Sequence, residues 1–160
     1  MDSPLTARAL EMAPEDYNMV MDLMASLWEE TCEDGANYRE YSPSVKDLWV
    51  EFLDGDKSIG AIRLRQWNGV TLQMCVNIRK ECRKDYAKYV PSAIHKWIKG
   101  NVDSKFKKVV AFIPSYFGNV LAFAKGAGWD EEGIMQKAFQ KNGDLHNIHV
   151  FGKKIEEMRA

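Results

Sequence analysis

The sequence has 160 residues, of which 46% are hydrophobic and 28% charged, a composition typical of a folded globular domain. Lysine and arginine number 22 and aspartate and glutamate 23, so the net charge is -1. This balance excludes a polybasic nucleic-acid-coating protein and an acidic disordered tail. No apolar run approaches the roughly 18 residues that a membrane-spanning helix needs, and the first residues lack the pattern of a secretory signal. We therefore expect one cytoplasmic domain over residues 1–160, with no membrane contact.

The cysteines and histidines do not form a metal-binding pattern. Cys32, Cys75 and Cys82 are odd in number and have no CxxC spacing, which favours reduced thiols in the cytoplasm. His146 and His149 stand three apart on a predicted strand, so they point to opposite faces and cannot share one ion. We predict no metal site, although either histidine could line a cleft as a base.

The first predicted elements are a short strand and an amphipathic helix. Residues 7–12 partly alternate between polar and apolar side chains, as a strand does. Pro14, Glu15 and Asp16 then provide a typical helix start, because the macrodipole favours acidic residues in the first turn. One face of this helix is apolar at spacings of three and four, with Tyr17, Val20, Met21, Met24, Leu27 and Trp28.

A period of two over residues 48–78 predicts a three-stranded antiparallel meander. The turn between the second and third strands is Asn68-Gly69, the strongest short hairpin signal. The third strand is expected from Val70 to Ile78.

The second half of the chain alternates helices and strands. A helix is predicted around residues 90–98, ending at Gly100, and the continuous apolar run 109–113 is typical of a buried strand. Another helix follows over residues 120–127, and two final strands flank the hairpin signal Asn142-Gly143. The predicted order is β, α, βββ, α, β, α, ββ, a mixed α/β (α+β) fold.

This order, together with the C-terminal residues, resembles the GNAT acyltransferase superfamily over residues 5–153. The most telling segment contains Ile113-Pro114, a helix, Gly128-Trp129, Glu132-Gly133, and a hairpin at Asn142-Gly143. The Ile-Pro and Gly-Asp-Leu motifs are most similar to those of compact phage-encoded members of the superfamily. The resemblance implies a GNAT-like fold: a mostly antiparallel twisted sheet of six to seven strands, splayed at its middle and flanked by three to four helices.

The resemblance also implies acetyl-CoA or another acyl-CoA as cofactor. The pantetheine arm would pair with the free edge of the strand that ends at Ile78, and the pyrophosphate would lie on the segment after it. Free N–H groups at a helix start attract phosphate. The implied cofactor-binding residues are Cys75, Val76, Ile78, Arg83, Lys84, Asp85, Tyr86, Ala87, Lys88 and Asn119.

Several positions depart from the family pattern. The family's phosphate loop has small residues where this chain has Tyr86 and Lys88, and Pro91 predicts a helix that starts near Val90. The helix tyrosine that usually protonates the leaving thiolate is replaced by Ala124. The family's cofactor-contacting asparagine falls at Phe117, with Asn119 two residues on. The strand before the loop carries no aspartate, glutamate or histidine, so we identify no catalytic residue.

Two classes of function remain open. The first is an acyl-CoA-dependent N-acyltransferase that acetylates an amine acceptor on a protein or small molecule. The second is a catalytically degenerate GNAT-fold protein, either a phage virion component or an inhibitor bound to a host protein partner. It predicts a cleft narrowed by Tyr86 and Lys88. Nucleic-acid binding is least favoured by the near-zero charge. A homodimer through the C-terminal strands is implied by the resemblance alone.

Charged clusters have two interpretations each. The basic cluster could hold the cofactor's phosphates or form a solvated surface; it comprises Arg79, Lys80, Arg83, Lys84 and Lys88. The acidic cluster could attract a basic amine, but a solvated helix end is favoured; it comprises Glu29, Glu30, Glu33 and Asp34.

For three further residues or residue groups, a structural role is the favoured interpretation. Basic neighbours of Cys82 predict a lowered thiol pKa, yet a buried or incidental cysteine is favoured over a nucleophile. His95 is expected to be structural or exposed. The methionines of the first helix are interpreted as core residues rather than as a ligand-binding stripe.

Overall fold

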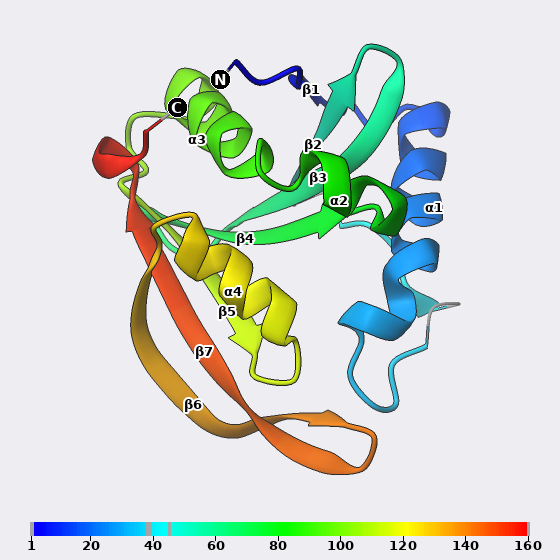
Figure 1. Ribbon diagram of the computed structural model, residues 1–160, viewed down its shortest axis with the longest axis vertical. Helices are drawn as coiled ribbons and strands as arrows, with labels where there is room; N and C mark the ends of the chain where they lie inside the picture. The colour runs from blue at the N-terminus through cyan, green and yellow to red at the C-terminus, as the bar shows by residue number, and fades with distance from the viewer. Residues whose placement is uncertain (1, 38–39, 45, 160) are drawn as a thin grey trace.

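The computed structural model describes residues 2–37, 40–44 and 46–159 (Figure 1). Seven strands form one sheet in the order β1-β2-β3-β4-β5-β7-β6, and only the β4–β5 pair is parallel. The mixed α/β fold with a mostly antiparallel seven-stranded sheet is therefore confirmed. The elements are β1 (Thr6–Ala9), α1 (Pro14–Thr31), β2 (Asp47–Asp54), β3 (Lys57–Gln66), β4 (Thr71–Ile78), α2 (Arg83–Tyr86), α3 (Val90–Asn101), β5 (Lys108–Pro114), α4 (Gly118–Gly126), β6 (Asp130–Lys141) and β7 (Asp144–Lys154).

The predicted meander is present as β2, β3 and β4. Its second turn is fixed by the side chain of Asn68, whose Oδ1 accepts hydrogen bonds from the backbone N–H groups of Val70 (2.9 Å) and Thr71 (3.0 Å). The first strand is shorter than the predicted residues 7–12. It ends at Ala9 because the chain turns there: Leu10 enters the core, and Met12 has a positive φ of 58°.

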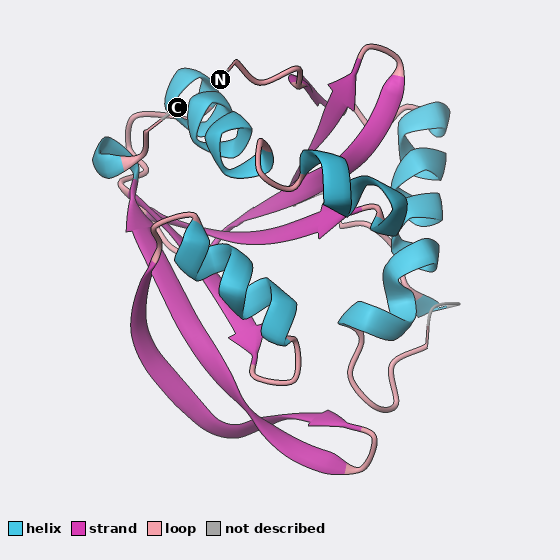
Figure 2. Ribbon diagram, viewed as in Figure 1, coloured by secondary structure: helices cyan, strands magenta, loops and turns pink. Residues whose placement is uncertain are grey.

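Helices cover the two faces of the sheet (Figure 2). Residues of α1 pack on one face, where Val20, Leu23 and Leu27 form a buried cluster with Trp49 and Ala61. The opposite face packs against α3 and α4 in a second, larger cluster; its buried members include Val50, Phe52, Ile62, Leu64, Met74, Ile94, Ile98, Ala124 and Phe151. The alternation of β2 explains this division, because successive side chains of a strand point to opposite faces.

An ion network ties α1 to the sheet. Arg8 of β1 donates to Asp16 and to Glu51, both at 2.9 Å. Each acid is 3% exposed, and each has a second hydrogen bond: Asp16 accepts from the N–H of Glu11, and Glu51 from the hydroxyl of Ser58. The network therefore balances two buried negative charges, Asp16 in the first turn of α1 and Glu51 on β2.

The sheet splits between β4 and β5. Their parallel register joins only Thr71–Gln73 to Lys108–Val110, after which β5 stays paired with β7 and β4 diverges from it (Figure 1). The carbonyl of Val70 faces β5 and accepts from Lys107 N–H (2.8 Å). Because backbone groups alternate along a strand, the N–H and C=O of Val76 face the same way, beyond the last paired residue. β4 thus offers unpaired backbone at the split.

No described helix is long and apolar enough to cross a membrane.

Candidate functional site

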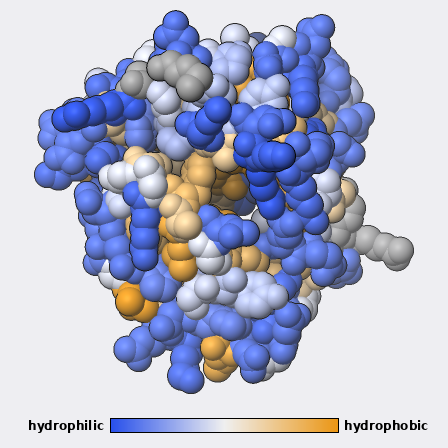
Figure 3. Space-filling model, in the orientation of Figure 1, coloured by the Kyte–Doolittle hydropathy of each residue, from blue (hydrophilic) through white to orange (hydrophobic). Residues whose placement is uncertain are grey.

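A cavity of about 570 Å³ occupies the split between β4 and β5. Figure 3 shows this region as a hollow with apolar residues around it and hydrophilic residues on the surrounding surface. Its floor comes from the end of β4, including Met74, Cys75 and Val76, and from β5, including Ala111 and Ile113. The volume falls in the range of small-molecule sites.

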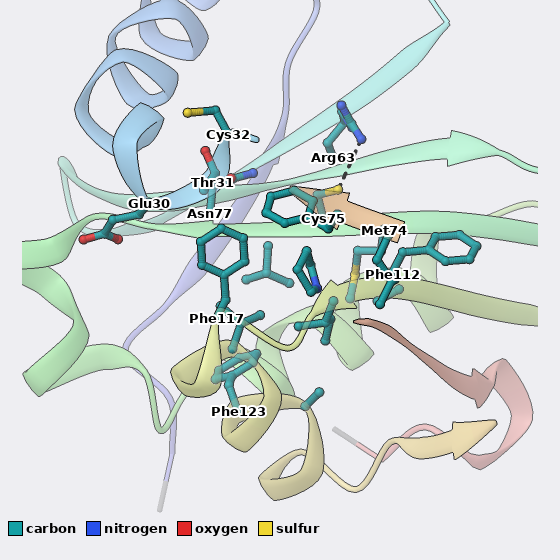
Figure 4. A pocket seen from close by; sticks show the side chains of 18 of the residues that line it. Glu30, Thr31, Cys32, Arg63, Met74, Cys75, Asn77, Phe112, Phe117 and Phe123 are labelled. Atoms are coloured by element: carbon teal, nitrogen blue, oxygen red, sulfur yellow. Dashed lines mark hydrogen bonds between the residues drawn. The ribbon is translucent and has the colours of Figure 1, made fainter. Parts of the chain in front are cut away.

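Two sets of side chains enclose this cavity from opposite sides of the β4 edge. From the α3 and α4 side come Pro91, Ile94 and Phe123. The opposite side is formed by the end of α1 and the meander. Figure 4 shows Phe117 and Phe123 on the α4 side, with Thr31, Cys32 and Arg63 across β4 from them. Residues far apart in the sequence therefore line one continuous space.

Of the predicted cofactor-binding residues, Cys75 and Val76 line the cavity. Ile78 ends β4, and its carbonyl accepts from Arg83 Nε at 3.2 Å. Asn119 is exposed in the first turn of α4 and lies outside the lining, where Phe117 takes the place beside the cavity. The remaining predicted residues lie together after β4, in and next to α2: Arg83, Lys84, Asp85, Tyr86, Ala87 and Lys88.

The basic segment after β4 faces the acidic end of α1. Glu30 accepts from Arg83 Nη2 at 2.6 Å and from Lys80 Nζ at 3.1 Å. The hydrogen bond from Arg83, followed by that from Lys80, lowers the pKa of Glu30 below its ordinary value despite partial burial. Arg79 pairs with Asp22 of α1 at 3.3 Å. Glu29, Glu33 and Asp34 are exposed, as expected for a solvated helix end, whereas the partly exposed Glu30 also contacts two cations at the rim of the cavity.

The two bulky residues of this segment, Tyr86 and Lys88, lie outside the cavity lining. The hydroxyl of Tyr86 donates to Asp54 Oδ2 in the β2–β3 turn at 2.7 Å, and this hydrogen bond raises the pKa of Tyr86 to about 12. Lys88 lies over the ring of Tyr89. Neither Tyr86 nor Lys88 lines the cavity. The narrowing expected for a degenerate site is contradicted by the structure. The late start of α3 at Val90 is confirmed.

A polar row crosses the sheet on the α1 side of the cavity. The register places Trp49 opposite Arg63 and Arg63 opposite Cys75. Arg63 Nη2 donates to Cys75 Sγ at 3.2 Å, as Figure 4 shows. Tyr41 also lines this side, and burial raises the pKa of its hydroxyl, against the opposing effect of the positive Arg63. The phenol therefore stays protonated at neutral pH, with an O–H that can donate a hydrogen bond.

The β6–β7 hairpin closes one side of the site through contacts with the loop after α1. Asp34 accepts from the backbone N–H groups of Asn142 (2.9 Å) and Gly143 (2.8 Å), and these bonds lower its pKa. Lys141, 7% exposed, donates to the carbonyls of Glu29 and Cys32 at the end of α1. Sequence reasoning missed this contact. The sequence shows an acidic helix end and a hairpin turn, but nothing in it indicates that the two contact each other.

His95 lies in the cavity lining with both ring nitrogens in hydrogen-bonding contact, whereas His146 and His149 lie outside the lining. Buried His95 accepts from Trp129 Nε1 at its Nε2 (3.1 Å), and its Nδ1 lies 2.9 Å from the carbonyl of Arg159. These contacts fit a neutral ring that donates from Nδ1, and burial lowers its pKa. His149 contacts Glu131, and His146 packs against Tyr116. Neither lines the cavity, so the suggestion that one serves there as a base is not supported.

The expected chemistry of Cys82 is changed by the structure. Cys82 is 1% exposed, and burial raises its pKa, so the lowered pKa predicted from its basic neighbours is wrong. The described residues contain no group of three or more histidine, cysteine, aspartate or glutamate side chains that could hold a metal ion. The methionines of α1 divide: Met19 packs against the core, whereas Met24 also lines the cavity.

No protein-family model matches the sequence, and no curated protein is found as a relative by sequence. Solved structures do match. The spermidine N-acetyltransferase of Vibrio cholerae in complex with CoA and spermine has a TM-score of 0.74 and 17% identity, with 98% of this chain and 99% of that chain covered. A chimera of the Vibrio cholerae SpeG enzyme and hSSAT has a TM-score of 0.78 and 17% identity, with 98% of each chain covered.

The chain has the GNAT fold. At this level of identity the likeness shows the fold, including the split sheet, whereas the named activities belong to the matched proteins. Both matched proteins are N-acetyltransferases, and one was solved with CoA and a polyamine.

Proposed function

We propose that this protein is an acyl-CoA-dependent N-acyltransferase that transfers an acetyl group to an amine. The observation that carries the proposal is the 570 Å³ cavity at the β4–β5 split, beside the unpaired backbone of Val76. An extended pantetheine arm pairs with such an edge as an added strand would. The CoA-bound structural neighbour supports this choice of ligand.

The residues present fit both ends of an acyl-CoA. Cys75 and Val76 border the space for the acyl end of the pantetheine arm. The segment from Ile78 to Lys88 holds the charged end, with Arg83 and Lys84 as the cations for phosphate oxygens. Asp85, Tyr86 and Ala87 contribute backbone to the same segment. In this proposal Arg83 exchanges its contact with Glu30 for a contact with phosphate.

The acyl-CoA supplies an acyl group activated as a thioester. The amine nitrogen forms a bond to the acyl carbon, the carbon–sulfur bond breaks, and the amine proton leaves for solvent or the departing thiolate. The chain contributes chiefly by holding the amine against the thioester in an apolar space that excludes water. Ala124 and Phe123, at the helix positions beside the cavity, carry no hydroxyl for the thiolate, so we assign no acid from α4.

The non-catalytic alternative, a phage virion component or an inhibitor of a host protein, predicted a cleft narrowed by Tyr86 and Lys88, and neither residue lines the cavity. Tyr86 is held by Asp54, and the cavity is open to a ligand. We propose the cytoplasm as the location, since the cysteines are free thiols. A homodimer stays a prediction.

The proposal is tested by thermal unfolding with and without acetyl-CoA, with dephospho-CoA and ATP as controls. A ligand at one hundred times its Kd adds about 2.7 kcal/mol to the unfolding free energy, which raises the Tm by several degrees. We expect this rise with acetyl-CoA and a smaller one in the Arg83→Ala variant. No shift at millimolar acetyl-CoA would refute the enzyme proposal, and a search for a protein partner would follow.

A further inference from the structure

The α1 side of the cavity contains hydrogen-bond donors that have no acceptor. Trp49 is 1% exposed and lines the cavity, and its Nε1–H has no hydrogen-bond partner among the described residues. The buried hydroxyl of Tyr41, also a lining residue, likewise lacks one in that part of the chain. A buried donor left unpaired costs free energy, and native proteins pair nearly all such groups. A ligand in this cavity that accepts hydrogen bonds would satisfy both donors.

The same side contains a positive charge without a balancing carboxylate. Arg63 is partly buried, and no described aspartate or glutamate forms an ion pair with it. Its hydrogen bond to Cys75 goes to sulfur, a weak acceptor. The nearby acid Asp47 is held by Arg65 through two hydrogen bonds of 2.6 and 3.0 Å. A partly desolvated guanidinium favours an anion with two oxygens, which it binds through parallel hydrogen bonds.

The position of these donors relates them to the acceptor rather than to the nucleotide end of acyl-CoA. Arg63 is paired in register with Cys75, which precedes Val76 at the unpaired edge of β4. The cations of the segment after β4 lie beyond the other end of this edge, at Arg83. A group bound by Arg63 is thus next to the place where amine and thioester meet in the proposed reaction.

We propose that the acceptor amine carries a carboxylate close to its nitrogen, held by Arg63, Tyr41 and Trp49, and that its side chain is apolar. The acceptor class is therefore an α-amino acid rather than a polyamine. A carboxylate has enough lone pairs for all three donors. Met24, Trp28 and Phe139 line the same cavity and provide apolar contacts for the side chain. This inference rests on the proposed function and defines its substrate.

The test compares matched acceptors at saturating acetyl-CoA, with release of the CoA thiol as the readout. L-Phenylalanine, L-leucine and L-methionine are each paired with the amine that lacks the carboxylate, such as 2-phenylethylamine, and spermidine is included. We expect at least one amino acid to exceed its paired amine in kcat/KM by about 10- to 100-fold, the effect of hydrogen bonds to a charged group.

Variants assign this preference to the three donors. Arg63→Gln should lower kcat/KM for the amino acid by about 10- to 100-fold more than for the paired amine, and Arg63→Lys should restore part of this difference. Trp49→Phe and Tyr41→Phe each keep the ring and should cause smaller losses of the same selectivity. Lys125→Gln, an exposed cation outside the cavity lining, is the charge-matched control.

Calorimetry of acetyl-CoA binding, done separately, distinguishes failure of the proposed function from failure of the acceptor proposal. If acetyl-CoA does not bind, the proposed function fails. If it binds, the acceptor proposal is overturned by any of three results: spermidine or the paired amines react as fast as the amino acids, no amino acid reacts, or Arg63→Gln lowers both members of a pair equally.

Discussion

The substitution Glu30→Gln should strengthen acyl-CoA binding. In the structure, one carboxylate neutralises Arg83 at 2.6 Å and Lys80 at 3.1 Å, in the segment where we propose that phosphate binds. The side chain of Glu30 is 35% exposed and those of Arg83 and Lys80 are 40% and 54% exposed, so each pair is worth about 0.2 to 1 kcal/mol. Releasing both cations for the ligand corresponds to a Kd for acetyl-CoA that is about 2- to 30-fold lower.

Calorimetry at low ionic strength measures this effect, which salt should reduce. Glu29→Gln is the matched control, because it removes the same charge from an exposed neighbour outside the cavity lining. Acetyl-pantetheine, which lacks the nucleotide and its phosphates, should bind Glu30→Gln and the unaltered protein alike. The reasoning is refuted if Glu30→Gln weakens acetyl-CoA binding, or if Glu29→Gln produces an equal gain.

Three further predictions concern stability, each measured by chemical denaturation. Arg8→Met leaves the buried Asp16 and Glu51 without their cation, and the free energy of unfolding should fall by about 3 kcal/mol. This is the low end for a broken buried ion pair, because Arg8 itself is 51% exposed. A loss below about 1 kcal/mol would contradict the role of the network. Gly60→Ala places a Cβ 2.2 Å from a backbone oxygen of β4, and the free energy of unfolding should fall by about 2 to 3 kcal/mol. An unchanged denaturation midpoint would instead show that β3 and β4 move apart at little cost. The pKa of His95 is lowered by burial, so the unfolded chain binds its proton first, near pH 6.5. The free energy of unfolding should therefore fall as the pH drops below about 6.5, by at most about 1.4 kcal/mol per pH unit, and His95→Gln should lose this part of the slope.

Much of the fold followed from local signals in the sequence. The change from a helical period to a period of two marked the start of the meander near Leu48, and Asn68-Gly69 fixed its second turn. The buried strand before Pro114 was visible as a continuous apolar run. These features depend on neighbours within a few residues, which explains why their boundaries agree with the structure to within a few positions.

The site depended on contacts between distant segments, which a single sequence does not encode locally. The pairing of Glu30 with Arg83 joins residues 53 apart, and that of Asp34 with Gly143 joins residues 109 apart. Burial reversed the expected effect of basic neighbours on the pKa of Cys82. The row from Trp49 through Arg63 to Cys75 required the register of three strands, so its unpaired donors were not visible before the structure.

The central claim is that acyl-CoA binds along the unpaired edge of β4, and amide hydrogen exchange tests it most directly. The N–H of Val76 faces the split beyond the paired residues Thr71–Gln73. With saturating acetyl-CoA, exchange at Val76 should slow markedly, while the already paired amides of β2 should change little. Binding of acetyl-CoA without protection at Val76, or no change in exchange anywhere along β4, would contradict the claim.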